Sequence, residues 1–240
     1  MTTIVNYIKV YNFDNKIRLG AKGDGGYVIG DIDGKYDCYI SAGVSDEESF
    51  SRDFINKYDM NEENSYAFDG TIQKYPYHYT NKITFIRRNI GSERTSDEAN
   101  LSYFIEKYNN MFLKMDIEGG EYTWLLSLNL DDLNKFKQIA IEFHGINDDS
   151  FGCDYNSKLK CLKKISETHY LIHAHGNNYS QKNTNGIPHV IELTYIRKDY
   201  FKEEPKLNTT ILPIPDLDFP NTNNGPEISL NFEPFFFSNP

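Results

Sequence analysis

The sequence predicts an α/β protein with a doubly wound, mostly parallel sheet of seven strands and one antiparallel strand near an edge. Three observations predict this class. Short apolar runs alternate with amphipathic helical stretches along most of the chain. The last two runs form a late hairpin, which places one antiparallel strand near the sheet edge. Polar residues follow the ends of the runs, where ligands bind in open α/β sheets.

The composition is that of one large globular domain with a net acidic charge. The chain has 240 residues, and 25 Lys and Arg against 35 Asp and Glu give a net charge of −10. This sign is wrong for a protein that binds a phosphate backbone, so we exclude nucleic acid as the main partner. No apolar stretch approaches the roughly 20 residues that span a bilayer.

The cysteine pattern favours a reducing compartment. Cys38, Cys153 and Cys161 are odd in number and widely spaced, which fits neither a disulfide framework nor a zinc ribbon. The first residues lack the cationic region and continuous apolar run of a signal peptide. We therefore expect a cytoplasmic protein.

The first structural signal is a glycine-rich stretch at residues 18–31. Asp24-Gly25-Gly26 is a hairpin-type turn, and the apolar residues 27–29 that follow it predict a strand. Two interpretations stay open here. The stretch is either a plain β-hairpin that leads into the domain, or a place where glycine lets the backbone approach a ligand closely.

The next stretch has the form of a first βα unit. Residues 36–41 predict a strand, Gly43 a turn, and a helix follows from Asp46. The phosphate-binding pattern GxGxxG is absent and the helix start is acidic, which disfavours a dinucleotide pyrophosphate. A cofactor with a cationic or zwitterionic end would tolerate it. The second strand, 65–68, ends at Asp69, which either receives ribose hydroxyls or only makes a turn.

The remaining elements continue the alternation. Their predicted ranges are strand 83–88, helix 96–108, strand 112–115, strand 138–143, helix 155–167, strand 170–174 and strand 187–197.

The strand at 112–115 leads into an acidic turn. Asp116 follows the last apolar residue, and Gly119 and Gly120 precede a helix. The segment is either a solvated turn or part of a site. Glu118 and Glu121 fall in the predicted first helical turn, where the helix dipole favours negative charge.

The strand ends together favour a site. Parallel strands present their carboxyl ends at one edge of a sheet, so residues that follow different strands meet there. The polar or glycine residues in these positions are Gly43, Asp69, Asn89, Asp116, Glu142 with His144, and His175 with Asn177.

The chain changes character near its end. Seven of the nine prolines fall in residues 205–240, so this segment is neither a regular helix nor a central strand. We predict a domain at 1–204 and a Pro-rich tail at 205–240. The apolar residues of the tail predict that it packs on the domain or on a partner, such as a second copy of the chain.

Six segments carry a resemblance to a known family. They are RLGAKGDGGYVI (18–29), YISAGVSDEESF (39–50), AFDGT (67–71), LKMDIEGGEY (113–122), IEFHG (141–145) and PHVIELTYIRKDY (188–200). In this order they resemble S-adenosylmethionine-dependent methyltransferases of the FkbM type, and within them the methyltransferase-like 24 group. The resemblance covers about residues 17–200. It implies a Rossmann-like fold and methyl transfer to a hydroxyl of a carbohydrate or nucleotide sugar.

The resemblance also implies which residues contact S-adenosylmethionine. The turn at Gly43 would pass under the methionine part, Asp69 would hold the ribose, and residues 89–92 would line the adenine pocket. Asp116 would sit where cofactor and acceptor meet. Residues 24–27 would close over the methionine end, and Glu118 could reach the ammonium group. The implied set is Asp24, Gly26, Tyr27, Ser41, Ala42, Gly43, Asp69, Gly70, Asn89, Ile90, Gly91, Asp116 and Glu118.

Two routes fit the activation of a sugar hydroxyl, which is a poor nucleophile at neutral pH. In one, His144 or Asp116 acts as general base. In the other, Asp116, Glu142 and His144 bind Mg²⁺ or Mn²⁺, which lowers the pKa of the acceptor. His175 either orients this arrangement or is a plain loop histidine.

Three rival functions stay open on sequence alone. An NAD-dependent nucleotide-sugar oxidoreductase fits the βα unit but lacks GxGxxG. A metal-dependent hydrolase would use Asp116, Glu142, His144 and His175, but it leaves Asp69 unexplained. An inactive carbohydrate-binding relative would not need the polar residues at the strand ends.

Overall fold

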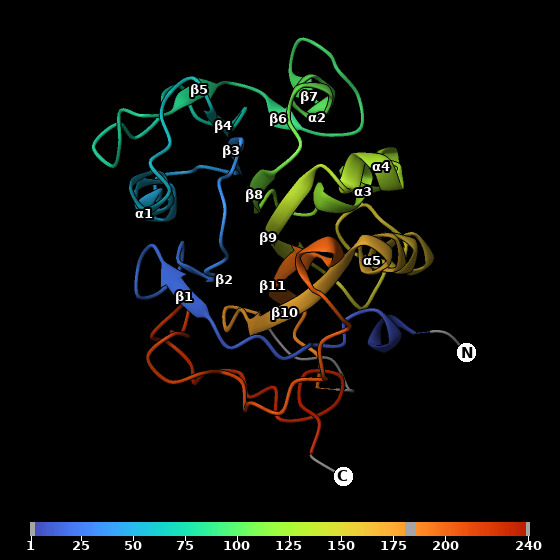
Figure 1. Ribbon diagram of the computed structural model, residues 1–240. Helices are drawn as coiled ribbons and strands as arrows, with labels where there is room; N and C mark the ends of the chain where they lie inside the picture. Colours follow the sequence, from blue (N-terminus) through green and yellow to red (C-terminus); the bar gives the residue numbers. More distant parts are fainter. Residues whose placement is uncertain (1–2, 181–185, 239–240) are drawn as a thin grey trace.

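The computed structural model describes residues 3–180 and 186–238, and within them the chain forms a central seven-stranded sheet (Figure 1). From one edge to the other its strands are β10 (His169–Gly176), β11 (Val190–Arg197), β9 (Phe136–His144), β8 (Met111–Met115), β3 (Cys38–Ala42), β4 (Ser65–Phe68) and β5 (Thr84–Ile86). Neighbouring strands are parallel except at β11, which is antiparallel to both β9 and β10. The predicted sheet class is confirmed.

The strand order reverses at the centre of the sheet. β3 pairs with β4 on one side and with β8 on the other, and the chain builds outward from this pair in both directions. In open α/β sheets such a reversal leaves a crevice at the carboxyl ends of the two strands, because their connections run to opposite sides.

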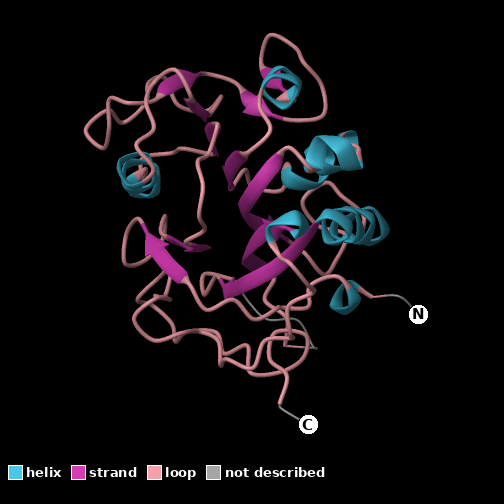
Figure 2. Cartoon of the chain, viewed as in Figure 1, coloured by secondary structure: helices cyan, strands magenta, loops and turns pink. Residues whose placement is uncertain are grey.

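Alternating side chains of the buried strands fill two cores, one on each face of the sheet. Ile40 and Leu113 face one core, while Tyr39 and Phe112 face the other. Helices cover the first face: α2 (Ser102–Lys107), α3 (Glu121–Ser127), α4 (Leu130–Leu133) and α5 (Tyr155–Thr168). Figure 2 shows α3, α4 and α5 gathered on one side of the sheet.

The second face is covered by one helix and a hairpin. The helix is α1 (Ser49–Lys57), and the hairpin joins β1 (Lys16–Leu19) to β2 (Tyr27–Gly30), as the glycine turn predicts. The Gln138 amide of β9 fixes the hairpin on the sheet. Its Oε1 accepts from Gly30 N at 2.8 Å, and its Nε2 donates to Gly30 O at 3.1 Å.

The predicted helix at 96–108 is wrong in its first half. Residues Glu98–Ala99 form strand β7, which pairs with β6 (Asn89–Ile90) in a separate two-stranded sheet, and α2 begins only at Ser102. The reason is local capping: the Thr95 hydroxyl accepts from the amides of Asp97 and Glu98, which holds them out of a helix. The helix predicted from Asp46 likewise begins later, at Ser49.

The residues of the tail that are described, 205–238, contain no helix or strand, yet they pack closely on the sheet domain. The backbone amide of Val10 donates to Pro234 O at 3.0 Å. Leu212, Leu230 and Phe235 belong to the core that lies under α3 and α5. Two 3-10 helices, η1 (Ile4–Asn6) and η2 (Lys198–Tyr200), complete the chain.

Among the described residues, every helix is too short or too polar to cross a membrane.

Candidate active site

A cavity of about 360 Å³ opens at the carboxyl ends of β3, β4 and β8, where the strand order reverses. The loops that follow these strands form most of its wall, and the turn of the β1–β2 hairpin closes one side. The lining residues are Asp24, Gly25, Gly43, Val44, Ser45, Asp46, Glu47, Phe68, Asp69, Thr71, Asn89, Ile90, Lys114, Asp116, Ile117 and Glu118.

Gly43 lets the loop after β3 pass directly against the end of β8. Its φ is +81°, in the left-handed region that favours glycine, and a β-carbon there would overlap the carbonyl oxygen of Asp116. The two strands stay in register up to this point, because the amide of Asp116 donates to Ala42 O at 2.9 Å. The position therefore demands glycine for both its backbone angle and its space.

Asp69 holds the same loop from the next strand. Its Oδ2 accepts from the amides of Val44 at 3.1 Å and Ser45 at 3.0 Å, and its Oδ1 accepts from Thr71 N and Oγ1. Burial raises the pKa of the Asp69 carboxyl, but these hydrogen bonds outweigh burial and lower it below its ordinary value. Asp69 is therefore an ionised side chain that shapes the cavity.

The adenine side of the predicted site is formed around Asn89. Its Oδ1 accepts from Gly70 N at 3.0 Å, and both Asn89 and Ile90 line the cavity. The sequence predicts that Asn89 directly follows a strand of the central sheet. In the structure it is instead the first residue of the short strand β6.

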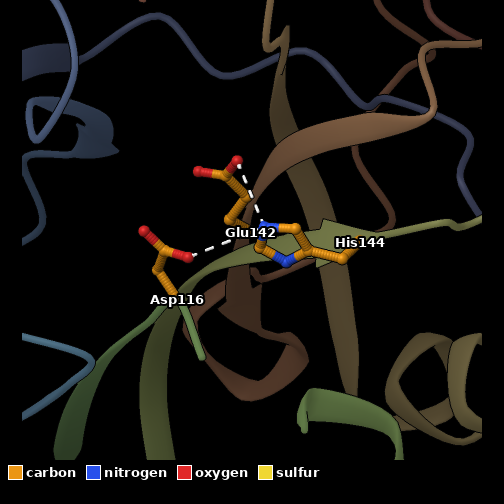
Figure 3. A group of neighbouring side chains, drawn as sticks. All are labelled: Asp116, Glu142 and His144. Carbon is orange, nitrogen blue, oxygen red and sulfur yellow. Dashed lines mark ion pairs between the residues drawn. The ribbon is translucent and has the colours of Figure 1, made fainter. Parts of the chain in front are cut away.

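Figure 3 shows the side chains of Asp116, Glu142 and His144 close together, and of the three Asp116 lines the cavity. Asp116 directly follows β8. Glu142 and His144 lie at the carboxyl end of β9, which extends farther than predicted. His144 Nε2 is 3.9 Å from Asp116 Oδ1 and 3.9 Å from Glu142 Oε1. One donor atom from each residue lies within 4.8 Å of the other two, which is a separation that one ion can bridge.

Glu121 fixes the orientation of the His144 ring. Its Oε1 lies 3.2 Å from His144 Nδ1 and also accepts from the amides of Ile117 and Gly119. Because a carboxylate accepts, Nδ1 carries the proton and Nε2 faces Asp116 and Glu142. Burial lowers the pKa of His144, but the hydrogen bond and charge of Glu121 and the nearby carboxylates outweigh it and raise it.

The position of Glu121 corrects the sequence interpretation. The sequence explains Glu121 by the helix dipole, yet its side chain is completely buried against His144. Glu118 lies before α3, has a φ of +55°, and is 81% exposed with Oε2 3.3 Å from His144 Nε2. The burial of Glu121 is explained by its pairing with His144, which is 23 residues away in the sequence. Local helix rules do not predict a contact over this distance.

Glu142 is almost completely buried. Burial raises the pKa of its carboxyl well above the ordinary value, and the charges of Asp116 and Glu192 raise it further. The Asn177 amide opposes this shift by donating to Glu142 Oε1 at 2.8 Å. Asn177 follows β10, so the convergence of strand ends predicted from sequence is met at this point.

His175 belongs to a neighbouring cluster. Its Nδ1 is 3.0 Å from Glu192 Oε2, and its Nε2 is 3.2 Å from Glu227 Oε2 in the tail. Both ring nitrogens thus face carboxylates. Burial lowers the pKa of His175, but these two partners outweigh it and raise the pKa well above its ordinary value. A catalytic role for His175 stays a prediction.

The structure brings together about half of the residues predicted to contact the cofactor. Tyr27 lies outside the cavity lining, but its hydroxyl is 3.5 Å from Asp116 Oδ2. The residues that line the cavity are Asp24, Gly43, Asp69, Asn89, Ile90, Asp116 and Glu118. The residues outside the lining are Gly26, Tyr27, Ser41, Ala42, Gly70 and Gly91. The roles of both sets stay predictions.

Comparison with known proteins defines the class. A scan against protein families matches residues 10–202 to the Methyltransferase FkbM domain. The match covers most of the chain, so the chain belongs to the FkbM methyltransferase family. A search of curated proteins gives no match. Among solved structures, a chain of a fibrillarin/Nop5p complex is similar at 10% identity, with a TM-score of 0.39 over 67% of this chain and 72% of that one.

The structural likeness is too weak to add to the fold that the strand order shows. Family membership is decisive for activity: the chain is an S-adenosylmethionine-dependent methyltransferase. The oxidoreductase and hydrolase alternatives are thereby set aside. Assignment to the methyltransferase-like 24 group stays a prediction.

Proposed function

We propose that the protein transfers a methyl group from S-adenosylmethionine to a hydroxyl of a sugar or glycan. One observation carries the proposal: Asp116 both lines the cavity and belongs to the group with Glu142 and His144. Asp116 would thus lie between a methyl donor bound in the cavity and the group that deprotonates the acceptor. Since a sulfonium methyl is already electrophilic, the protein's main task is to align and deprotonate the acceptor oxygen.

The cavity supports the predicted placement of the cofactor. The methionine part would lie along the Gly43 loop, the ribose near Asp69, and the adenine between Asn89 and Ile90. Asp69 already accepts four hydrogen bonds from the chain, which is the capacity of a carboxylate. A ribose hydroxyl would therefore replace one of them, and the Thr71 hydroxyl is the donor that rotates away most easily.

The donor set beside the cavity fits a divalent cation. Asp116 and Glu142 would supply carboxylate oxygens, and His144 would supply Nε2, because Glu121 holds the proton on Nδ1. Mg²⁺ and Mn²⁺ prefer such oxygen-rich sets. When bound, the ion would lower the pKa of the acceptor hydroxyl. Without an ion, the imidazole of His144 is the base that the geometry offers.

Two substitutions on facing strands test the ion. Glu142 and Glu192 stand opposite each other on β9 and β11, but Glu192 contacts His175 instead of His144. We expect E142Q to weaken Mn²⁺ binding about tenfold or more, as loss of a charged ligand does, and E192Q to leave it unchanged or to tighten it, because removing the Glu192 charge favours the ionised form of Glu142. Calorimetric titration of Mn²⁺ measures both. Equal effects of the two variants, or no binding by wild type, would remove the metal route.

The acceptor is tested by transfer of a labelled methyl group. Wild type and D116N are each incubated with labelled S-adenosylmethionine and a panel of nucleotide sugars, oligosaccharides and simple polyols. We expect oxygen-linked label on at least one sugar with wild type and a loss of at least about 100-fold with D116N, because Asp116 joins the two halves of the site. Label found only on nitrogen or sulfur acceptors would contradict the proposal.

The tail and the cellular location complete the proposal. The apolar residues Leu212, Leu230 and Phe235 pack into the chain's own core, so the tail needs no partner to bury them. Homo-oligomerisation through the tail stays a prediction.

The three cysteines are free and buried, which supports the expectation of a reducing, cytoplasmic location.

A further inference from the structure

The charges around the cavity are one-sided. Six carboxylates and a single cation, Lys114, line it among the described residues. The amino-acid end of S-adenosylmethionine carries a sulfonium, an ammonium and a carboxylate. An acidic wall suits the two positive groups, whereas the carboxylate requires a cation or several hydrogen-bond donors. The acidic residues of the wall are Asp24, Asp46, Glu47, Asp69, Asp116 and Glu118.

Lys114 is placed to meet this need. It belongs to β8, two residues before Asp116, and only 5% of it is exposed. Its Nζ donates to Gly43 O at 2.7 Å, so the ammonium lies at the loop that the methionine part is proposed to follow. Among the described residues, no carboxylate forms an ion pair with this ammonium; the charges of buried Glu48 and of Asp24 act on it only from beyond ion-pair distance. A buried charge without a contacting counter-ion is costly unless a ligand supplies one.

Lys114 differs from the other buried lysines in its place in the cavity wall, not in its hydrogen bonds. Lys137 on β9 is also buried, and its Nζ also donates to one loop carbonyl, Asp33 O, at 2.6 Å. Lys137 lies outside the cavity wall and contacts no predicted site residue. By contrast, Lys158, which is also buried, has Asp148 at 3.8 Å. Among the lysines that the structure describes, only Lys114 combines burial, a place in the cavity wall and the absence of an ion pair.

We propose that the Lys114 ammonium binds the carboxylate of S-adenosylmethionine while it holds the Gly43 loop. This assignment rests on the proposed placement of the cofactor in the cavity. It gives one side chain two tasks at the same point: one N–H fixes the loop under the methionine part, and the remaining N–H groups meet the ligand. Lys114 is then a cofactor-binding residue whose contribution depends on the ligand's carboxylate.

Two ligands that differ only in that carboxylate test the assignment. They are S-adenosylhomocysteine and its decarboxylated form, in which the amino-acid end is a propylamine. Calorimetry gives the dissociation constant of each for wild type, K114M and the matched control K137M. Methionine keeps the length of lysine without its charge. Thermal unfolding of the three proteins checks that each remains folded at the titration temperature.

For wild type we expect S-adenosylhomocysteine to bind about tenfold or more tightly than the decarboxylated ligand, as one charge-assisted hydrogen bond gives. K114M should lose this preference: both ligands lose the support of the Gly43 loop, but S-adenosylhomocysteine is weakened about tenfold more than the decarboxylated ligand. K137M should keep the wild-type preference. K114R, which restores a cation, should recover part of it.

The failures are distinguishable. If K114M weakens both ligands equally, Lys114 only supports the Gly43 loop and the assignment is wrong. If K114M keeps the wild-type preference, another group binds the carboxylate. If wild type binds neither ligand, the placement of the cofactor in this cavity fails, and the assignment fails with it.

Discussion

Gly43 is the residue at which backbone conformation and site geometry meet. Its positive φ and its close contact with the end of β8 each favour glycine for a different reason. Comparison with a second glycine, which has only the positive φ, distinguishes the two effects. Gly152 also has a positive φ, +69°, but a β-carbon there would meet nothing within 4 Å. We expect G152A to cost about 1–2 kcal/mol of unfolding free energy, from backbone strain alone.

G43A should cost about 1–3 kcal/mol more than G152A, because the added methyl must displace the backbone at Asp116. Urea unfolding followed by circular dichroism measures both variants. G43A should also lose cofactor affinity, whereas G152A should keep it. Equal stabilities would show that the loop after β3 moves freely away from Asp116.

The residues of the site that sequence could predict are those that stand at strand ends. Asp116 and His144 were predicted because each closes an apolar run and precedes glycine, a pattern visible within five residues. Lys114 and Glu121 escaped for a physical reason. Lys114 stands inside a strand that is buried on both faces, so no periodicity reports which way it points. Glu121 acquires its role from His144, a partner distant in sequence.

At the scale of elements, strands with continuous apolar runs were predicted well, and short edge pieces were not. β3, β4 and β8 bury nearly all their residues, so hydrophobicity alone locates them. The pair β6 and β7 buries little and is held by backbone bonds such as Asn89 N to Asp97 O, which no local pattern predicts. In the predicted helix at 96–108, this pairing adds to the Thr95 cap in holding residues 97–99 out of a helix.

The junction of α5, β10 and β9 contains a buried histidine that makes stability depend on pH. His169 Nε2 donates to Phe136 O at 2.8 Å, and its Nδ1 is 2.7 Å from the Thr168 hydroxyl. Burial lowers the pKa of His169 from 6.5 to about 4, and the charge of Arg197 adds to this, although the bond to Phe136 opposes it. The folded protein therefore holds a neutral imidazole.

The sign of the effect follows from the proton count. Between pH 6.5 and about 4 the unfolded chain binds a proton at His169 that the folded chain does not, so stability falls as pH falls through this window. The shift corresponds to at most about 3.5 kcal/mol. We expect H169Q to flatten this part of the pH profile, measured by urea unfolding at several pH values. The exposed H78Q variant is the control and should keep the wild-type slope. An unchanged slope in H169Q would place the titration elsewhere.

At the scale of the whole molecule, the tail contacts segments of the domain that lie far apart in the sequence. It lies beyond residue 202, where the FkbM match ends. Arg18, in strand β1 of the hairpin, donates to Leu217 O at 3.2 Å and to Gly23 O at 2.7 Å. On β10, His173 Nε2 lies 2.8 Å from Asp218 Oδ1. The tail thus contacts both the hairpin that closes the cavity and β10, the strand that carries His175.

Asn221 of the tail makes the most direct link to the site. It is buried, and its Nδ2 donates to Glu192 Oε1 at 2.8 Å and to Asp24 Oδ1 at 3.3 Å. Asp24 lines the cavity. N221A removes both bonds, so we expect faster hydrogen exchange at residues 20–26 and a loss of about threefold to tenfold in S-adenosylhomocysteine affinity.

The exposed residue Asn224, three positions along the tail, provides the matched control. N224A shortens the same side chain in the same segment but leaves the bonds to Asp24 and Glu192 intact, so exchange at 20–26 and affinity should match wild type. Exchange measured by mass spectrometry on both variants decides whether the tail orders the hairpin turn. If N221A exchanges like N224A at 20–26, the turn is held by Arg18 and its own backbone, and the tail acts on the site only through the stability of the fold.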